Sequence, residues 1–195
     1  LELTDARSLL LMEVDGTEQA TTEDIALLES LCRDHDAISI RVAKDEAARD
    51  EMWLMRKNLS LILRAKARLK INHDVVVPIS NIPALFRKIS SLRSETKLTI
   101  ACFGHVGDGN IHVNILVDPS NESVMNQAKQ AERALFRAVV DLDGSISGEH
   151  GIGYSKARYL PLQLTDNTIE AMKTIKAAFD PHGILNPGKI FQANT

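Results

Sequence analysis

The sequence predicts an α+β fold, in which helices cover one face of a mainly antiparallel sheet. Two observations support this class. Long segments of helical periodicity alternate with short strand-like runs, and two of these runs flank a strong hairpin signal at Asp108-Gly109. The predicted order is β-α-β-α-β-α-β-β-α-α. Its two βαβ-like halves suggest ferredoxin-like character, as a doubled split βαβ arrangement, without any repeat in the sequence itself.

The chain begins with a predicted strand and a predicted helix. Residues 6–14 form a strand-like run with an apolar stretch, which stops at the turn signal Asp15-Gly16. The polar residues 21–24 are typical of a helix start. The inner face of that helix is expected to carry Ile25, Leu28 and Cys32.

A second strand and a long helix follow. Residues 37–42 alternate between apolar and polar side chains, which favours a strand, and residues 44–68 have the length and pattern of a helix. The side chains expected to point inward from this helix are Trp53, Leu54, Leu61 and Ile62.

The middle of the chain contains the hairpin. Residues 75–78 form a predicted strand that ends at a proline, and a helix starts at Asn81 with Pro83 in its first turn, where the missing N–H is harmless. Residues 98–104 and 111–117 are then two strands around a turn.

The last third is predicted to be mainly helical. Residues 119–141 place apolar side chains at core spacing, residues 144–153 are glycine-rich and irregular, and residues 167–179 form a last helix before the tail. The expected core positions of the helix at 119–141 are Ala131, Leu135 and Val139.

Composition excludes several classes of protein. The 195 residues carry a net charge of -3, without a basic face that would suit nucleic acid. No apolar run approaches the roughly 20 residues that span a bilayer, and no signal peptide is visible. The two cysteines form no disulfide framework or metal-binding spacing, which favours a reducing compartment.

The hairpin brings two histidines together. A two-residue type I′ turn at Asp108-Gly109 would place His105 directly opposite His112, with Cβ atoms about 4.5–5.5 Å apart. Two imidazoles at that distance suit one metal ion. Asn114 would share their face, and the other face would be apolar. A longer loop would break this pairing and still bring the histidines close, whereas histidines beside a glycine turn can also be ordinary surface residues.

A second group of candidate residues lies in the Ser-Gly-Glu-His-Gly-Ile-Gly segment at 147–153. Glu149 is the candidate carboxylate to complete a metal site with the two histidines, and three protein ligands leave positions open for catalysis. His150 is the candidate general base, because the pKa of histidine is naturally close to neutral. The alternative is a flexible, solvated loop.

Three motifs in this order resemble the C-terminal domain of the FAD-linked oxidase family. They are the hairpin at 104–114, the loop at 147–153 and the tail Phe-Asp-Pro-His-Gly-Ile-Leu-Asn-Pro-Gly-Lys-Ile at 179–190. The family includes the flavin subunit of glycolate oxidase, D-lactate dehydrogenase and D-2-hydroxyglutarate dehydrogenase. The resemblance covers essentially the whole chain. It implies an α+β domain that covers a flavin held by a separate N-terminal domain.

The resemblance also implies residue roles. His105, His112 and Glu149 would hold a divalent metal, with zinc expected, while His150 acts as the base and Asn114 contacts substrate. The remaining implied roles are substrate binding by Arg56 and Ser60 and an approach to the flavin by Asn186.

One position departs from the family pattern. Some members have a lysine two residues before the aspartate of Asp-Val-Val-Val-Pro, and this chain has Asn72 there. Lys70 would share that face if the strand extends so far, which makes it a candidate substrate contact. The asparagine therefore leaves open whether the substrate carries a second carboxylate.

The predicted function is oxidation of a small D-2-hydroxy acid to a 2-oxo acid, by hydride transfer to FAD. The base would take the hydroxyl proton, and Arg56 would bind the acid through a bidentate contact. A metal-dependent hydrolase and a non-catalytic ligand-binding module of ferredoxin-like fold are the alternatives.

The chain is expected to be one cap and substrate domain over residues 1–195, cut from a longer polypeptide and inactive alone. Its expected partner is the FAD-binding domain of that polypeptide, which is absent from this chain. A homodimer and electron-transfer subunits stay open. The expected location is the cytoplasm, with peripheral attachment at the inner membrane face as the alternative.

Overall fold

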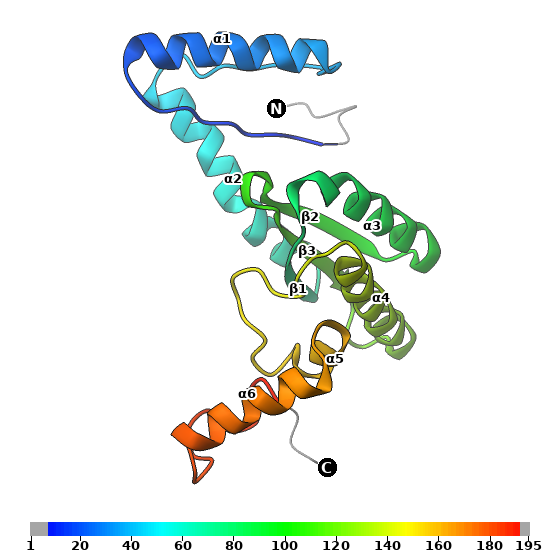
Figure 1. The fold of residues 1–195 in the computed structure, drawn as a ribbon. Helices are drawn as coiled ribbons and strands as arrows, with labels where there is room; N and C mark the ends of the chain where they lie inside the picture. The colour runs from blue at the N-terminus through cyan, green and yellow to red at the C-terminus, as the bar shows by residue number, and fades with distance from the viewer. Residues whose placement is uncertain (1–7, 192–195) are drawn as a thin grey trace. The chain divides into compact units, whose positions relative to one another are not determined.

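The computed structural model describes residues 8–191, which belong to two compact units divided between Ser60 and Leu61. The first unit contains helix α1 (Glu18–Asp34), and helix α2 (Glu46–Lys66) runs across the division (Figure 1). Helix α1 begins three residues before the predicted start, because the Thr17 side chain accepts a hydrogen bond from the Ala20 N–H and caps the helix.

The two strands predicted before residue 45 are not formed. Residues 8–14 and 37–42 have no strand pairing, and the rest of the first prediction, residues 6 and 7, lies outside the described residues. Alternation alone does not make a strand, because a strand needs a partner, and Ile38 is 73% exposed. The doubled arrangement is therefore replaced, within the described chain, by a single three-stranded sheet.

Helix α2 is confirmed, but the predicted inward face is wrong. Leu54, Leu61 and Ile62 are 57%, 62% and 47% exposed, whereas Trp53 is half-buried and donates a hydrogen bond from its indole to Glu13. Apolar side chains lie on more than one side of this helix, so the spacing could not decide which side packs within the chain.

The sheet is formed by β1 (Leu69–Val76), β2 (Thr99–His105) and β3 (Asn110–Val117). Both pairings are antiparallel, and β3 lies between β1 and β2. Strand β1 begins six residues before the predicted run, because the three consecutive polar residues at 72–74 interrupt the alternation that marks a strand.

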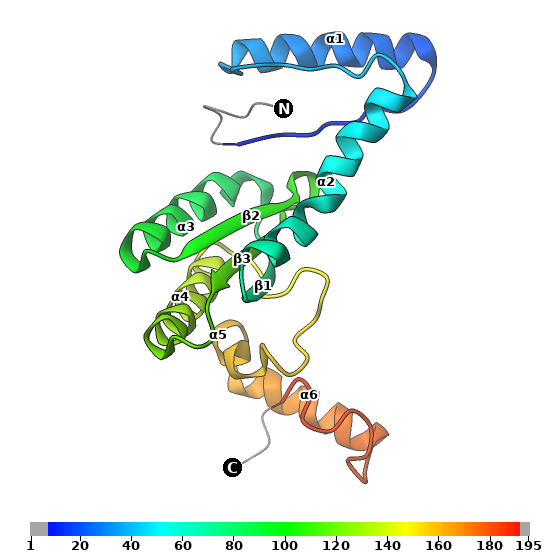
Figure 2. The same cartoon turned by 180° about the vertical axis from the view of Figure 1, so that it is seen from behind.

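Helices α3 (Ile82–Thr96) and α4 (Glu122–Asp141) lie along one face of this sheet, as Figures 1 and 2 show from opposite sides. A short 3-10 turn, η1 (Ile79–Asn81), leads into α3, and Pro83 lies in its first turn as predicted. The core between the helices and the sheet contains Leu85, Ile89, Ile100, Val113, Ile115, Ala131, Leu135, Phe136 and Val139. This confirms the α+β class and the apolar face of the hairpin.

The hairpin itself has a longer loop than predicted. The 3-10 turn η2 (Val106–Asp108) and Gly109 connect the strands, so Phe103 faces His112 and His105 faces Asn110. The two-residue turn is wrong because Asp108 accepts a hydrogen bond from the Asn110 N–H, which stabilises the wider loop. The change shifts the register by two residues, so the side chains keep their faces.

The C-terminal segment returns to the sheet. Ser145 pairs with Val76, and the chain runs beside the outer edge of β1 until the N–H of Gly148 donates to the Asp74 carbonyl. It then forms the 3-10 turn η3 (Ala157–Tyr159) and the helices α5 (Leu160–Gln163), which the sequence did not predict, and α6 (Asp166–Phe179). In the part of the chain described, no helix has the length and apolar character that crossing a membrane requires.

Candidate metal site

The sheet face that turns away from α3 and α4 carries a row of buried polar side chains. Asp74 on β1 lies opposite His112 on β3, and Asn72 lies opposite Asn114 two residues along. Asp74 and Asn114 are fully buried, and His112 is 8% exposed. Buried polar groups persist only where they are bonded or where they serve a ligand, so this face is the candidate site.

Asp74 binds the loop that carries Glu149 and His150. One carboxylate oxygen, Oδ2, accepts hydrogen bonds from the backbone N–H groups of Glu149 at 2.6 Å and His150 at 2.8 Å. The Ser147 hydroxyl lies 3.4 Å from the same oxygen. The other oxygen, Oδ1, accepts a hydrogen bond from the Lys156 ammonium and lies 3.3 Å from Nδ1 of His150.

These contacts keep Asp74 ionised. Burial opposes the charged form, but the backbone donors of His150 and Glu149 and the Lys156 ammonium together lower the pKa of Asp74 to about 2. The carboxylate is therefore a fixed negative charge directly behind the loop at any physiological pH.

Three metal-ligand side chains meet beside Asp74. Ligand atoms of His112, Glu149 and His150 all lie within 4.8 Å of one another. Oε1 of Glu149 lies 3.3 Å from Nε2 of His112 and 3.5 Å from Nε2 of His150. The rings of the two histidines are stacked with centroids 5.6 Å apart.

The donor set fits a divalent ion. Two imidazoles and one carboxylate are ligands that zinc and other divalent transition metals accept, and three ligands leave coordination positions open. The Glu149 and His150 side chains are about half exposed, at 53% and 49%, so solvent reaches this group of side chains. Burial lowers the pKa of His112, although Glu149 acts against it, and a neutral imidazole is the form that binds metal.

His105 lies next to this group without belonging to it. It is exposed, it shares the face of His112, and the two ring centroids are 6.0 Å apart. The structure therefore brings together two of the three predicted ligands, His112 and Glu149, and adds the predicted base, His150. A ligand role for His105 stays a prediction.

The predicted substrate contacts on the sheet lie on the site face. Lys70 is within β1 and on the same side as Asn72 and Asp74, because the strand does extend that far. Burial lowers the pKa of Lys70. Asn114 lies on this face too, but its amide bonds with Asn72 and with the Ala101 carbonyl, so substrate would have to displace one of these partners.

The remaining predicted residues belong to helix α2 and to the tail. Arg56 and Ser60 are one helical turn apart on α2, and both are half-buried. Asn186 is exposed in the tail, with a left-handed φ of 48°. Their substrate and flavin roles stay predictions.

Sequence reasoning missed Asp74 and Lys156. An acid directly before the apolar run that begins at Val75 was a signal for Asp74, because a buried acid needs a partner. Lys156 gave no signal, since its partner is 82 positions away.

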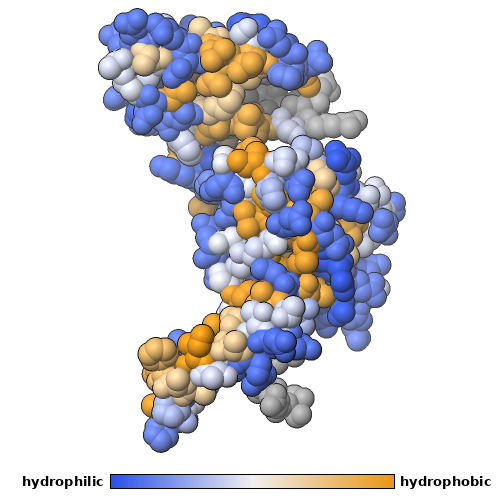
Figure 3. Space-filling model, viewed as in Figure 1, coloured by the Kyte–Doolittle hydropathy of each residue, from blue (hydrophilic) through white to orange (hydrophobic). Residues whose placement is uncertain are grey.

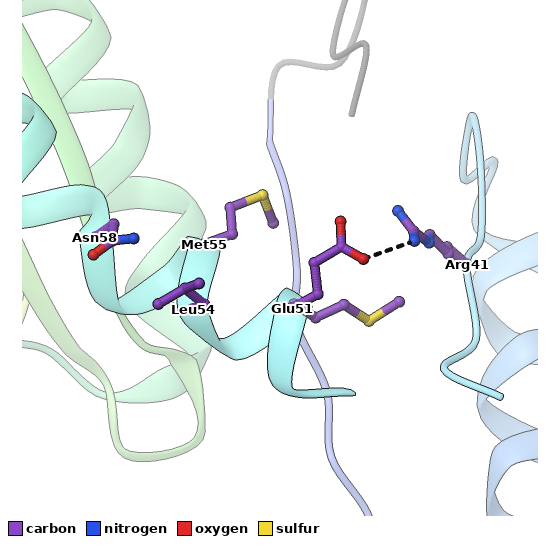
Figure 4. A pocket seen from close by; sticks show the side chains of 6 residues that line it. Arg41, Glu51, Leu54, Met55 and Asn58 are labelled. Carbon is purple, nitrogen blue, oxygen red and sulfur yellow. Dashed lines mark hydrogen bonds and ion pairs between the residues drawn. The ribbon is translucent and has the colours of Figure 1, made fainter. Parts of the chain in front are cut away.

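A separate pocket lies in the first unit (Figure 4). Its lining includes an exposed ion pair, in which Arg41 lies 3.5 Å from Glu51. Exposed pairs contribute about 0–1 kcal/mol, and none of the predicted site residues lines the pocket. The other lining residues are Met52, Leu54, Met55 and Asn58.

The chain is similar in sequence to a known family and to several known proteins. The family "FAD linked oxidases, C-terminal domain" matches residues 2–190. The chain is 39% identical over 191 residues to glycolate oxidase subunit GlcD of Bacillus subtilis, covering 96% of this chain and 40% of that protein. It is 31% identical to mitochondrial D-lactate dehydrogenase [cytochrome] of Arabidopsis thaliana, covering 96% of this chain and 33% of that protein.

A third relative is a D-2-hydroxyglutarate dehydrogenase, from Stutzerimonas stutzeri. The chain is 32% identical to it over 195 residues, covering 97% of this chain and 42% of that protein. The chain thus spans about two fifths or less of the length of these relatives.

Proposed function

Because this chain belongs to the C-terminal domain family of the FAD linked oxidases, we propose that it supplies the metal and substrate site of a flavin-dependent enzyme. The reaction is oxidation of a D-2-hydroxy acid to a 2-oxo acid. The names of the relatives, which include glycolate oxidase and D-lactate dehydrogenase, support this class of substrate.

The cluster of His112, Glu149 and His150 carries the proposal. His112 and Glu149 would hold the metal, with His105, whose ring centroid lies 6.0 Å from that of His112, as the third ligand. When bound, a divalent ion supplies acidification of a ligand hydroxyl, and FAD supplies the acceptor for the hydride.

His150 is the proposed base for the substrate hydroxyl. It is half-exposed, so substrate can reach it, and its Nδ1 lies 3.3 Å from the Asp74 carboxylate. An N–H at Nδ1 would be stabilised by that carboxylate, which leaves Nε2 as the proton acceptor.

The substrate carboxylate is assigned to Arg56, with Ser60 assisting one turn later. A guanidinium can bind a carboxylate through two parallel hydrogen bonds. Asn114 would contact substrate from the sheet. Lys70, on the site face of β1, is the candidate contact for a second carboxylate of a longer substrate.

The proposed partner is the FAD-binding domain of the same polypeptide. Exposed apolar side chains gather on α6 and the tail, where Figure 3 shows a strongly apolar surface, and Phe179 is 82% exposed. Such a patch is typical of a surface that another domain covers. We place the protein in the cytoplasm, with peripheral attachment at the inner membrane face as the alternative.

A substrate panel on the full-length protein tests the proposal. Glycolate, D-lactate and D-2-hydroxyglutarate are offered with an artificial electron acceptor, before and after chelation of divalent metal. We expect turnover of at least one acid, loss of activity on chelation and recovery with zinc. Activity that survives complete metal removal would refute the metal site, and flavin-independent hydrolysis would refute the reaction class.

A further inference from the structure

We infer that Asp74 and Lys156 form a positioning pair, which holds the loop of residues 147–150 in its ligand-presenting conformation before any metal binds. The metal part of this inference rests on the proposed function. The ordering of the loop does not, because its contacts are within the chain.

The anchoring begins with the two backbone N–H groups that converge on Oδ2 of Asp74. These donors belong to Glu149 and His150, the two residues of the loop that face the candidate ion. The carboxylate therefore fixes the backbone of both residues, and not only the direction of one side chain. Its second oxygen is in contact with the His150 ring, at 3.3 Å from Nδ1.

Hydrogen bonds of the Ile146 and Gly148 N–H groups hold the start of the loop, whereas glycines surround its two candidate site residues. Glycines flank the pair at Gly148, Gly151 and Gly153, and the last two have left-handed φ values of 74° and 51°. Glycine gives the backbone more freedom than any other residue. Without the carboxylate, two N–H groups would lose their acceptor, and the segment would exchange among several conformations.

Lys156 completes the anchor from the far end of the loop. Its side chain is buried, and the ammonium donates to the Asp74 carboxylate and, at 3.1 Å, to the Asp74 backbone carbonyl. The positive charge balances an acid that is fully buried, and removal of one member of such a pair leaves an uncompensated charge. The strand residue Asp74 thus binds both ends of the segment between Glu149 and Lys156.

An ordered loop should raise metal affinity, because ordering is completed at folding and not at binding. Replacement of residues that orient metal ligands typically weakens metal binding by about 10–100-fold. We expect a loss of that size from Asp74→Asn, with the ligands themselves unchanged.

The test uses the full-length protein and the variants Asp74→Asn, Lys156→Met and Lys156→Arg. Asp118→Asn is the matched control, because it removes an exposed carboxylate that lies outside the site and contacts Arg68. Hydrogen–deuterium exchange of peptides that cover residues 145–152, measured without metal, reports loop order. Competition with a chelator reports zinc affinity.

We expect faster exchange at the Glu149 and His150 amides in Asp74→Asn and Lys156→Met, by roughly tenfold or more. Zinc binding should weaken by about 10–100-fold. Lys156→Arg should restore much of both properties, and Asp118→Asn should match the wild type. The double variant Asp74→Asn/Lys156→Met leaves neither charge unpaired, so it keeps the test valid if a single variant fails to fold.

Wild-type exchange and zinc affinity in the folded double variant would overturn the inference. If the wild type binds no divalent metal, the proposed function fails, while the exchange measurement still decides whether Asp74 orders the loop. A loss of zinc affinity without any change in exchange would also overturn it, because the pair would then act on the ligands and not on the loop.

Discussion

Replacement of Glu132 by glutamine removes the one negative charge from a buried cluster on the helix side of the sheet. Oε2 of Glu132 accepts hydrogen bonds from the Tyr159 hydroxyl at 2.5 Å and from Arg158 at 2.8 Å, and Oε1 lies 3.1 Å from Nε2 of His73. Glu132, His73 and Tyr159 are all at least 90% buried. The cluster ties the η3 turn, which follows the site loop, to helix α4.

The magnitude follows from these contacts. A hydrogen bond to a charged group contributes about 1.5–3 kcal/mol, and glutamine keeps the acceptor for Tyr159 but loses the charge. The Arg158 side chain is 48% exposed, so its share is about 0–1 kcal/mol. We expect Glu132→Gln to lower the free energy of unfolding by about 2–3 kcal/mol at neutral pH.

The difference should depend on pH. Burial opposes ionisation of Glu132, but contacts with His73, Tyr159 and Arg158 hold its pKa below the ordinary value of 4.5. A group with a lowered folded pKa stabilises the protein above its unfolded pKa, and this stability is lost as the pH falls through the folded pKa. The gap between wild type and variant should therefore be full at neutral pH and shrink below about pH 4.5.

Equilibrium unfolding in urea, followed by far-UV circular dichroism from pH 7 to pH 3.5, measures this gap. Glu170→Gln is the control, because Glu170 is exposed and lies 3.6 Å from Lys173 in a surface pair. The reasoning is refuted if Glu132→Gln costs no more than the control, or if its effect is the same at every pH.

Three further predictions concern single residues. Gly109→Ala should destabilise the protein by about 2 kcal/mol or more in thermal unfolding, because Gly109 has a φ of 78° and a Cβ there would lie 2.0 Å from the Val77 carbonyl oxygen. Cys102 should resist iodoacetamide at pH 8 in the folded protein, since burial raises its thiol pKa to about 11, and mass spectrometry of the labelled peptide checks this. Arg56→Lys should raise the KM of the full-length enzyme for its hydroxy acid about tenfold, because lysine cannot make a bidentate contact, and steady-state kinetics would contradict the assignment by showing an unchanged KM.

Local signals were sufficient to predict the helices and the hairpin. Helical periodicity predicted α1, α2, α3, α4 and α6, and the apolar alternation predicted β2 and β3. Pairing could not be predicted so well, because it depends on residues distant in sequence. The alternating run at 37–42 has no partner strand, and the polar start of β1 becomes a strand only through its pairing with β3.

In the candidate site too, some features could be predicted from short motifs and others could not. His112, Glu149 and His150 could be identified from short motifs, because the first follows the turn at Gly109 by three residues and the other two lie between glycines of an open loop. His105 lies diagonally across from His112, and not directly opposite it, because the Asp108 side chain accepts a hydrogen bond from the Asn110 N–H and so favours the longer loop. The general preference of Asp-Gly for a two-residue turn does not take this competing hydrogen bond into account.

Strand β1 restricts how this protein can change in length during evolution. Neighbouring residues of the strand serve opposite faces, since His73 contacts the Glu132 cluster and Asp74 holds the site loop. Insertion or deletion of one codon within the strand would exchange these two faces, placing the aspartate among the helices and the imidazole under the loop. Homologous sequences should therefore vary in length at exposed loops such as the one between β3 and α4, while the interval between Lys70 and Val76 stays constant.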